Sequence, residues 1–89
     1  MENSSSYLIS GLDKYCPDNG PIRSIIHDLC DFAPSDSTLT IKFKKRLGQV
    51  IAQCRVASGS GTYTASSSAR THLEATRDLQ TKIISKLQV

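Results

Sequence analysis

Two neighbouring stretches in the middle of the chain alternate apolar and polar residues with a period of two. In STLTIKFK (residues 37–44) the apolar positions are 39, 41 and 43, and in QVIAQCRV (residues 49–56) they include 50, 52, 54 and 56. Successive side chains of a strand point to opposite faces of a sheet, so each stretch predicts a strand with one apolar face. The residues between them, KRLG (45–48), favour a turn. The pattern predicts an antiparallel hairpin whose apolar face packs on a core and whose polar face meets water.

Two helices are predicted before this hairpin. Pro21 suits the first position of a helix, and apolar residues then recur at helical spacing until Pro34 ends the pattern. Residues 6–16 predict an earlier helix, with the serines at 4–6 as its cap and Pro17 as its breaker.

A third strand and a last helix are predicted after the hairpin. ASGSG (57–61) indicates a turn, and TYTA (62–65) is typical of a short strand. The last helix is expected to follow Ser66–Ser68 and to reach about Leu87. The expected fold class is α+β, in the order α-α-β-β-β-α, with a three-stranded antiparallel sheet packed on helices.

An all-α four-helix bundle is the alternative fold. Residues 40–56 could form one helix, because five apolar residues also fit a helical stripe: Phe43, Leu47, Val50, Ile51 and Cys54. The threonines before Lys42 and the glycine at position 48 favour strands instead.

The length and composition are those of one small globular domain. The chain has 89 residues, of which 38% are hydrophobic and 21% charged, and we expect a flexible tail at residues 1–5 and a single domain over 6–89. No apolar run approaches the roughly 18 residues that span a membrane, and the start lacks the regions of a signal peptide. Cys16, Cys30 and Cys54 are odd in number and widely spaced, which predicts reduced, buried thiols and a cytoplasmic protein.

Charge is divided unevenly along the chain. Residues 1–40 carry six acidic and two basic side chains, whereas residues 41–89 carry nine basic and two acidic ones. The densest cluster is KFKKR (42–46), with four cations in five residues. Such asymmetry indicates a basic face that meets an anionic partner. The simpler interpretation is that the two halves neutralise one another within the fold or within a dimer.

The expected hairpin turns most of these cations toward water. Phe43 would point into the core, so Lys42, Lys44 and Arg55 would lie on the wet face with Thr40 and Gln53, and Lys45 and Arg46 at the hairpin tip. Arg70, after Ser67 and Ser68, would lie at the N-terminus of the last helix, where free backbone N–H groups favour phosphate. The candidate nucleic-acid-binding residues are Lys42, Lys44, Lys45, Arg46, Arg55 and Arg70. A solvated strand face and ordinary helix capping are the alternatives.

Two families share parts of this pattern. The order α-β-β-β-α over about residues 21–88 resembles that of double-stranded-RNA-binding domains. GTYTASSSARTHLEATRDLQTKIISKLQ (61–88) resembles the end of ribosome hibernation factors. Such a factor normally has a strand before its first long helix, where this sequence indicates a helix. Both resemblances imply RNA contact, at Lys45, Arg46 and Arg70.

The residues give no support for catalysis, a cofactor or a metal. Cys16, His27, Cys30, Cys54 and His72 contain no C-x-x-C pair, and the cysteines fall on apolar stripes. We therefore predict a non-enzymatic protein that contacts the backbone of structured or duplex RNA through its basic hairpin and the N-terminus of its last helix. The alternative is a small protein–protein interaction module (an adaptor, effector or inhibitor) acting as a homodimer, which an apolar Ile51 on the wet face favours.

Overall fold

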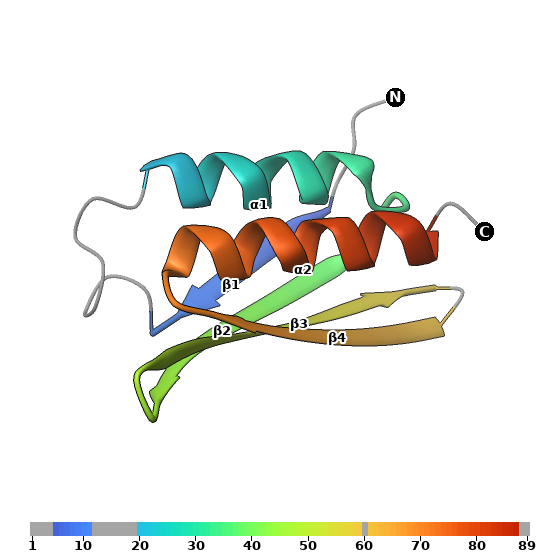
Figure 1. Cartoon of the computed structure of the whole chain (residues 1–89). Coiled ribbons are helices and arrows are strands. Elements are labelled where there is room, and N and C mark those ends of the chain that lie inside the picture. Colours follow the sequence, from blue (N-terminus) through green and yellow to red (C-terminus); the bar gives the residue numbers. More distant parts are fainter. Residues whose placement is uncertain (1–4, 12–19, 60, 88–89) are drawn as a thin grey trace.

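A four-stranded mixed sheet carries two helices on one of its faces (Figure 1). The computed structural model describes residues 5–11, 20–59 and 61–87. In chain order the elements are β1 (Ser6–Ser10), α1 (Gly20–Phe32), β2 (Thr38–Arg46), β3 (Gln49–Ser58), β4 (Gly61–Ala69) and α2 (His72–Leu87). The strand order is β1-β2-β3-β4. The α+β class is therefore confirmed, and the all-α alternative is wrong, because residues 40–56 form most of two paired strands.

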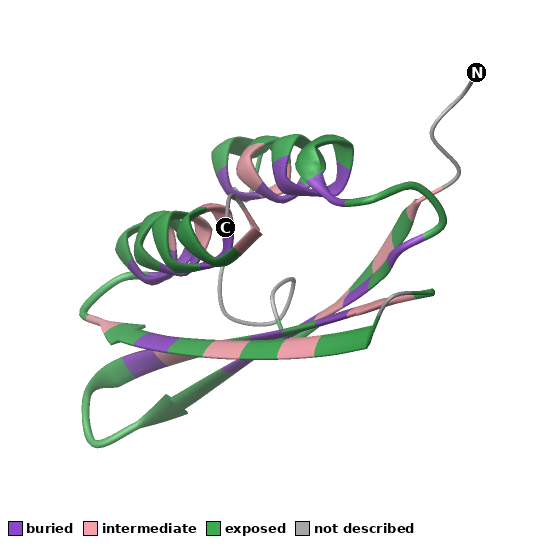
Figure 2. Cartoon of the chain, turned by 90° about the vertical axis from the view of Figure 1, so that its right-hand side faces the viewer, coloured by how far each residue is buried: buried purple, intermediate pink, exposed green. Residues whose placement is uncertain are grey.

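The predicted meander forms because its apolar positions share one face. β2 and β3 pair antiparallel with Phe43 opposite Ala52, and β3 and β4 pair antiparallel with Cys54 opposite Ala65. The inward residues expected from the alternation are all buried: Leu39, Ile41, Phe43, Val50, Ala52 and Cys54. Figure 2 shows the buried positions gathered where the helices face the sheet.

The predicted first helix over residues 6–16 is wrong, and the sheet has a fourth strand there. β1 pairs parallel with β2, from Ser6 opposite Thr38 to Ser10 opposite Lys42. Tyr7 and Ile9 are half-buried against the core, while the residues between them are exposed, which is a period of two. Leu8, between them, is 66% exposed. Residues 12–16 of that helix lie outside the described residues.

Helix α1 supplies the crossover that parallel pairing of β1 and β2 requires. Its apolar stripe is buried as expected, at Ile22, Ile26, Leu29 and Cys30. Ser5, just before β1, ties the start of that strand to the α1–β2 connection, since its hydroxyl donates to the Pro34 carbonyl at 2.9 Å and accepts from the Ser37 N–H at 3.1 Å. The division into a tail (1–5) and a domain (6–89) stays a prediction, and residues 1–4 lie outside the described part of the chain.

Strand β4 is longer than predicted and the last helix starts later. Ser66–Ser68 continue the strand, because alternate residues from Tyr63 to Ala69 face the core side and the whole segment pairs with β3. Helix α2 begins at His72, and Thr71 caps it by accepting a hydrogen bond from the Glu74 N–H at 3.1 Å. Leu79 and Ile83 on α2 complete the core. Neither described helix is long and apolar enough to span a membrane.

Both described cysteines are buried thiols, as the sequence predicted. Cys30 lies on α1 and Cys54 on β3. Burial raises the pKa of the Cys54 thiol to about 12 and also raises the pKa of Cys30. Both side chains therefore stay protonated near neutral pH and act as small apolar groups. Cys16 lies outside the described residues.

The β2–β3 hairpin closes through two residues rather than the four expected. Arg46 pairs with Gln49, so Leu47 and Gly48 alone form the tip. Their φ angles are 53° and 78°, and positive values at both positions define a type I′ turn. A leucine in this left-handed region costs roughly 1–2 kcal/mol relative to an ordinary conformation. Lys45 and Arg46, predicted to lie at the tip, are the last two residues of β2.

Candidate nucleic-acid interface

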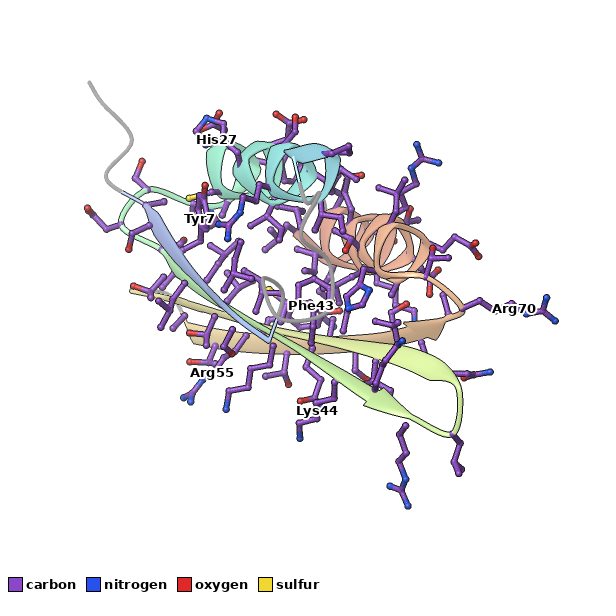
Figure 3. The ribbon with its side chains drawn as sticks, turned by 90° about the vertical axis from the view of Figure 1, so that its left-hand side faces the viewer. Tyr7, His27, Phe43, Lys44, Arg55 and Arg70 are labelled. Atoms are coloured by element: carbon purple, nitrogen blue, oxygen red, sulfur yellow. The ribbon has the colours of Figure 1, made fainter. Side chains whose placement is uncertain are left out.

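The face of the sheet that points away from the helices is polar and basic. Lys44 and Arg55 project from it on the side opposite the helices (Figure 3). We call this surface the outer face and define it by the outward positions of β2, β3 and β4: Thr40, Lys42, Lys44, Gln53, Arg55, Thr64 and Ser66. The outward direction predicted for Lys42, Lys44, Gln53 and Arg55 is confirmed by their exposure.

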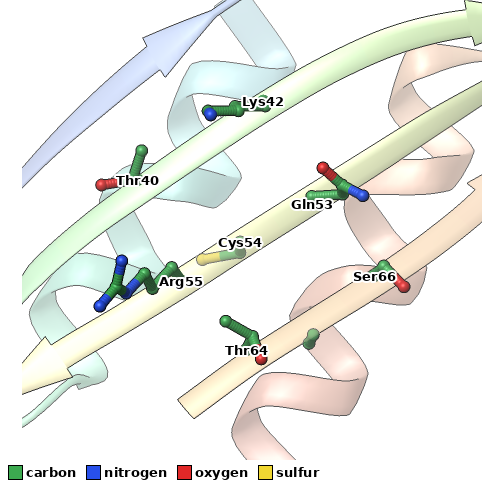
Figure 4. Close-up of a pocket in the computed structure, with 8 residues that line it drawn as sticks. Thr40, Lys42, Gln53, Cys54, Arg55, Thr64 and Ser66 are labelled. Atoms are coloured by element: carbon green, nitrogen blue, oxygen red, sulfur yellow. The ribbon is translucent and has the colours of Figure 1, made fainter. Parts of the chain in front are cut away.

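A shallow hollow of about 460 Å³ crosses the middle of the outer face. Lys42 and Arg55 stand on its rim, with the hydroxyl and amide side chains of Thr40, Gln53 and Thr64 around it (Figure 4). None of its lining residues is acidic. The hollow therefore offers two cations and several neutral hydrogen-bonding groups, which is the chemistry of a sugar–phosphate backbone site.

The KFKKR stretch is divided between the two sides of the sheet. Lys42 and Lys44 alternate with buried Phe43, so they belong to the outer face. Lys45 has the opposite parity, and its charge acts on the buried His72 of α2. The four cations thus do not form a single cluster: Lys42 and Lys44 lie on the outer face, Arg46 has the same parity at the end of β2 beside the hairpin tip, and Lys45 has the opposite parity.

Arg70 lies at the same end of the molecule as that tip. It follows β4, whose last residue Ala69 pairs with Val50, and Val50 in turn pairs with Lys45. Figure 3 shows its side chain extending away from the body of the protein. The structure therefore brings Lys45, Arg46 and Arg70 to one end of the sheet.

The predicted serine-lined phosphate seat at the last helix is wrong. Ser67 is buried within β4, and its hydroxyl donates to the carboxylate of Asp78 on α2. This hydrogen bond is the main cause that lowers the pKa of Asp78. The serine joins strand to helix, so its hydroxyl serves the fold and not a ligand. Arg70 and Thr71, not the serines, precede the free N–H groups of α2.

None of the described strand residues is acidic. The five acidic residues that the structure describes lie on the helices or in the α1–β2 connection: Asp28, Asp31, Asp36, Glu74 and Asp78. Five of the described basic residues lie on β2 and β3. The sheet side is therefore positive and the helix side mixed. Within the described ranges, no group of three or more histidine, cysteine or carboxylate side chains could hold a metal ion.

Two solved structures have the same arrangement of strands and helices. A ribosomal subunit interface protein from Coxiella burnetii superposes with a TM-score of 0.72 at 16% identity, covering 94% of this chain and 92% of that one. The Protein Y N-terminal domain of Thermus thermophilus gives a TM-score of 0.71 at 8% identity, covering 99% and 97%. The chain therefore shares the fold of these two proteins.

The resemblance noted for residues 61–88 is thereby confirmed at the level of the fold. The strand that such factors have before their first long helix is β1, which the sequence pattern had suggested was helical. No protein-family model matches the chain, and no curated protein matches it at a significant level.

Three features of the surface were not predicted from the sequence. Thr64 and Ser66 join the outer face only because β4 continues through the serines. Leu8 lies next to Thr40 in the β1–β2 pairing, and so adds an exposed apolar side chain beside the hollow. The hairpin tip has only two residues, Leu47 and Gly48, because Lys45 and Arg46 continue β2 beyond the alternating stretch.

His72 makes the folded protein sensitive to acid. Its ring is 7% exposed and lies 5.6 Å from the ring of Phe43, and burial and then the charge of Lys45 lower its pKa from the ordinary 6.5. The unfolded chain therefore binds the proton more readily, so stability is full above 6.5 and falls as the pH drops below it. We expect the urea midpoint to fall between about pH 7.5 and pH 5.

Two variants would show whether His72 causes this pH dependence of stability. His72→Leu should show a smaller fall of the urea midpoint over the same range, because the titrating ring is gone. His27 is exposed, so His27→Gln should leave the dependence caused by His72 in place. An unchanged dependence in His72→Leu would show that another group titrates.

Proposed function

We propose that this protein is a non-enzymatic RNA-binding protein that attaches to a ribosomal subunit through the backbone of structured ribosomal RNA. The observation that carries the proposal is the separation of charge: the described strands hold no acidic residue, and their cations face outward or flank the hairpin tip. A surface kept basic only for solubility would be expected to intersperse both signs. A face of one sign instead attracts a polyanion.

The shape of this surface fits a duplex better than a small anion. The outer face runs across three strands, and the tip and Arg70 extend the positive charge beyond its end. Double-stranded RNA is recognised largely by its shape and its phosphate and 2′-hydroxyl groups. The proposed contacts are Lys42, Lys44, Lys45, Arg46, Arg55 and Arg70. The ribosomal subunit as the target is supported by the protein from Coxiella burnetii, which is described as a ribosomal subunit interface protein.

Direct binding tests this function. Fluorescence anisotropy should be measured with labelled duplex RNA, single-stranded RNA and duplex DNA at low and physiological salt, beside co-sedimentation with purified ribosomal subunits. We expect duplex RNA to bind at low salt and to weaken steeply as salt rises, because binding releases counterions. We also expect the protein to pellet with one subunit. Failure to bind any RNA at low salt and failure to pellet would together refute the proposal.

A homodimeric protein-interaction module is the second candidate. Leu8 is 66% exposed and Ile51 is half-buried, and both lie on the side of the sheet opposite the helices. Apolar groups on a wet face can mark a buried contact. A dimer in sedimentation equilibrium, combined with no nucleic-acid binding, would favour this candidate.

A further inference from the structure

Leu47 stands in a conformation and an environment that both disfavour leucine. Its side chain is 94% exposed, and its backbone φ is 53°, in the left-handed region. The first central position of a type I′ turn is normally occupied by asparagine, aspartate or glycine. Neither burial nor backbone geometry in the isolated molecule therefore accounts for a leucine here. A partner that covers this side chain would account for it.

The surroundings of Leu47 indicate the chemistry of that partner. Arg46 precedes it directly, and Lys44 and Lys45 lie within three residues. The two-residue turn places Leu47 at the end of the β2–β3 hairpin, next to these cations along the chain. A nucleic acid is complementary to this combination. The apolar side chain can contact the face of a base, and the neighbouring cations can contact the anionic phosphates.

We propose that Leu47 packs against the face of an unstacked base, at a bulge or loop that interrupts the RNA duplex held by the neighbouring cations. This rests on the proposed function and deepens it by naming the RNA feature that is preferred. A continuous A-form duplex presents little apolar surface to a leucine side chain, because its major groove is deep and narrow and its minor groove displays polar hydroxyls. Apolar side chains gain contact area where bases are unstacked, as the wedges of minor-groove proteins do.

The test uses Leu47→Asn, which converts the turn to Asn-Gly. This pair is the one that type I′ geometry favours, so the variant should unfold at a higher temperature than the wild type. Two labelled RNA duplexes would be compared by anisotropy, identical except for one unpaired adenosine. The wild type should prefer the bulged duplex. We expect the variant to lose about tenfold affinity for it, the value of one buried leucine side chain, and to bind the paired duplex within about twofold.

Higher thermal stability with weaker binding of the bulged RNA separates a contact role from a folding role. Leu8→Asn replaces another described leucine that is exposed, on β1, and should leave the preference for the bulge unchanged. Equal binding of the bulged duplex by wild type and Leu47→Asn would overturn the proposal, as would an equal loss on both duplexes. A wild type that binds neither duplex at low salt would overturn the proposed RNA binding itself.

Discussion

The variant Lys44→Glu, Lys45→Glu, Arg46→Glu is expected to lose at least about 100-fold in affinity for duplex RNA at low salt. Each substitution removes a cation from the end of β2 and puts a carboxylate in its place, where the described strands otherwise carry none. The loss should be similar for unrelated sequences, because phosphate contacts carry no sequence information. The slope of log affinity against log salt should also become shallower, by roughly one for each phosphate that the protein no longer neutralises.

A charge-matched variant shows whether position or net charge is responsible. Arg23→Glu, Arg77→Glu, Lys86→Glu changes the formal charge by the same amount, but all three residues lie on the helices. We expect this variant to keep most of the affinity, within about fivefold, since only long-range attraction is weakened. Circular dichroism should confirm that both variants are folded. Equal losses in the two variants would contradict a binding surface on the sheet.

The largest effect on stability is expected from Leu79→Ala. Leu79 is fully buried and lies in the cluster where α2 packs on the sheet. Truncation of a buried leucine costs about 2–5 kcal/mol, because less apolar surface is buried on folding and a cavity remains. A small domain has only about 5–15 kcal/mol in total, so we expect a large fall in the urea midpoint and in the melting temperature.

The same substitution at the hairpin tip provides the control. Leu47→Ala removes the same atoms from a side chain that is 94% exposed, so its free energy of unfolding should change by less than about 0.5 kcal/mol. A comparable loss of stability in both variants would show that the tip is packed in solution, which would conflict with the structure.

The strict alternation of apolar and polar residues in β2 and β3 made these two strands predictable. β1 and the serines of β4 lack such alternation, and both were assigned wrongly. Phe43 and Cys54 fall in stretches where every second residue is apolar, so both strands and their inward faces followed from the sequence. β1 has only five residues, and its Leu8 and Ile9 are adjacent, which fits a helix or a strand equally well. Tertiary pairing with β2 decides between them. The serines of β4 favour caps by propensity, but pairing with β3 overrides that preference.

The sequence predicted which face of the sheet the candidate residues lie on, but not which of them lie close together. Lys44 and Arg55 were placed on the wet face by parity alone. The position of Arg70 beside the hairpin tip depends on where β4 ends and on its register with β3, which local sequence does not specify. Lys45 was misplaced because the turn has two residues and not four, so this lysine remains in the strand and turns toward His72.

The parallel pairing of β1 also has a consequence for the order of folding. The other three strands are joined in sequence by short connections, whereas Ser6 must find Thr38 across the whole α1 crossover. Contacts so distant along the chain form slowly, because closing the loop costs chain entropy. β1 is therefore expected to dock last and to open first, as a unit separate from the meander. Each opening would make β2 the edge strand of the sheet and expose its backbone N–H and C=O groups beside Lys42. An extended segment of another chain could then pair with β2 in place of β1.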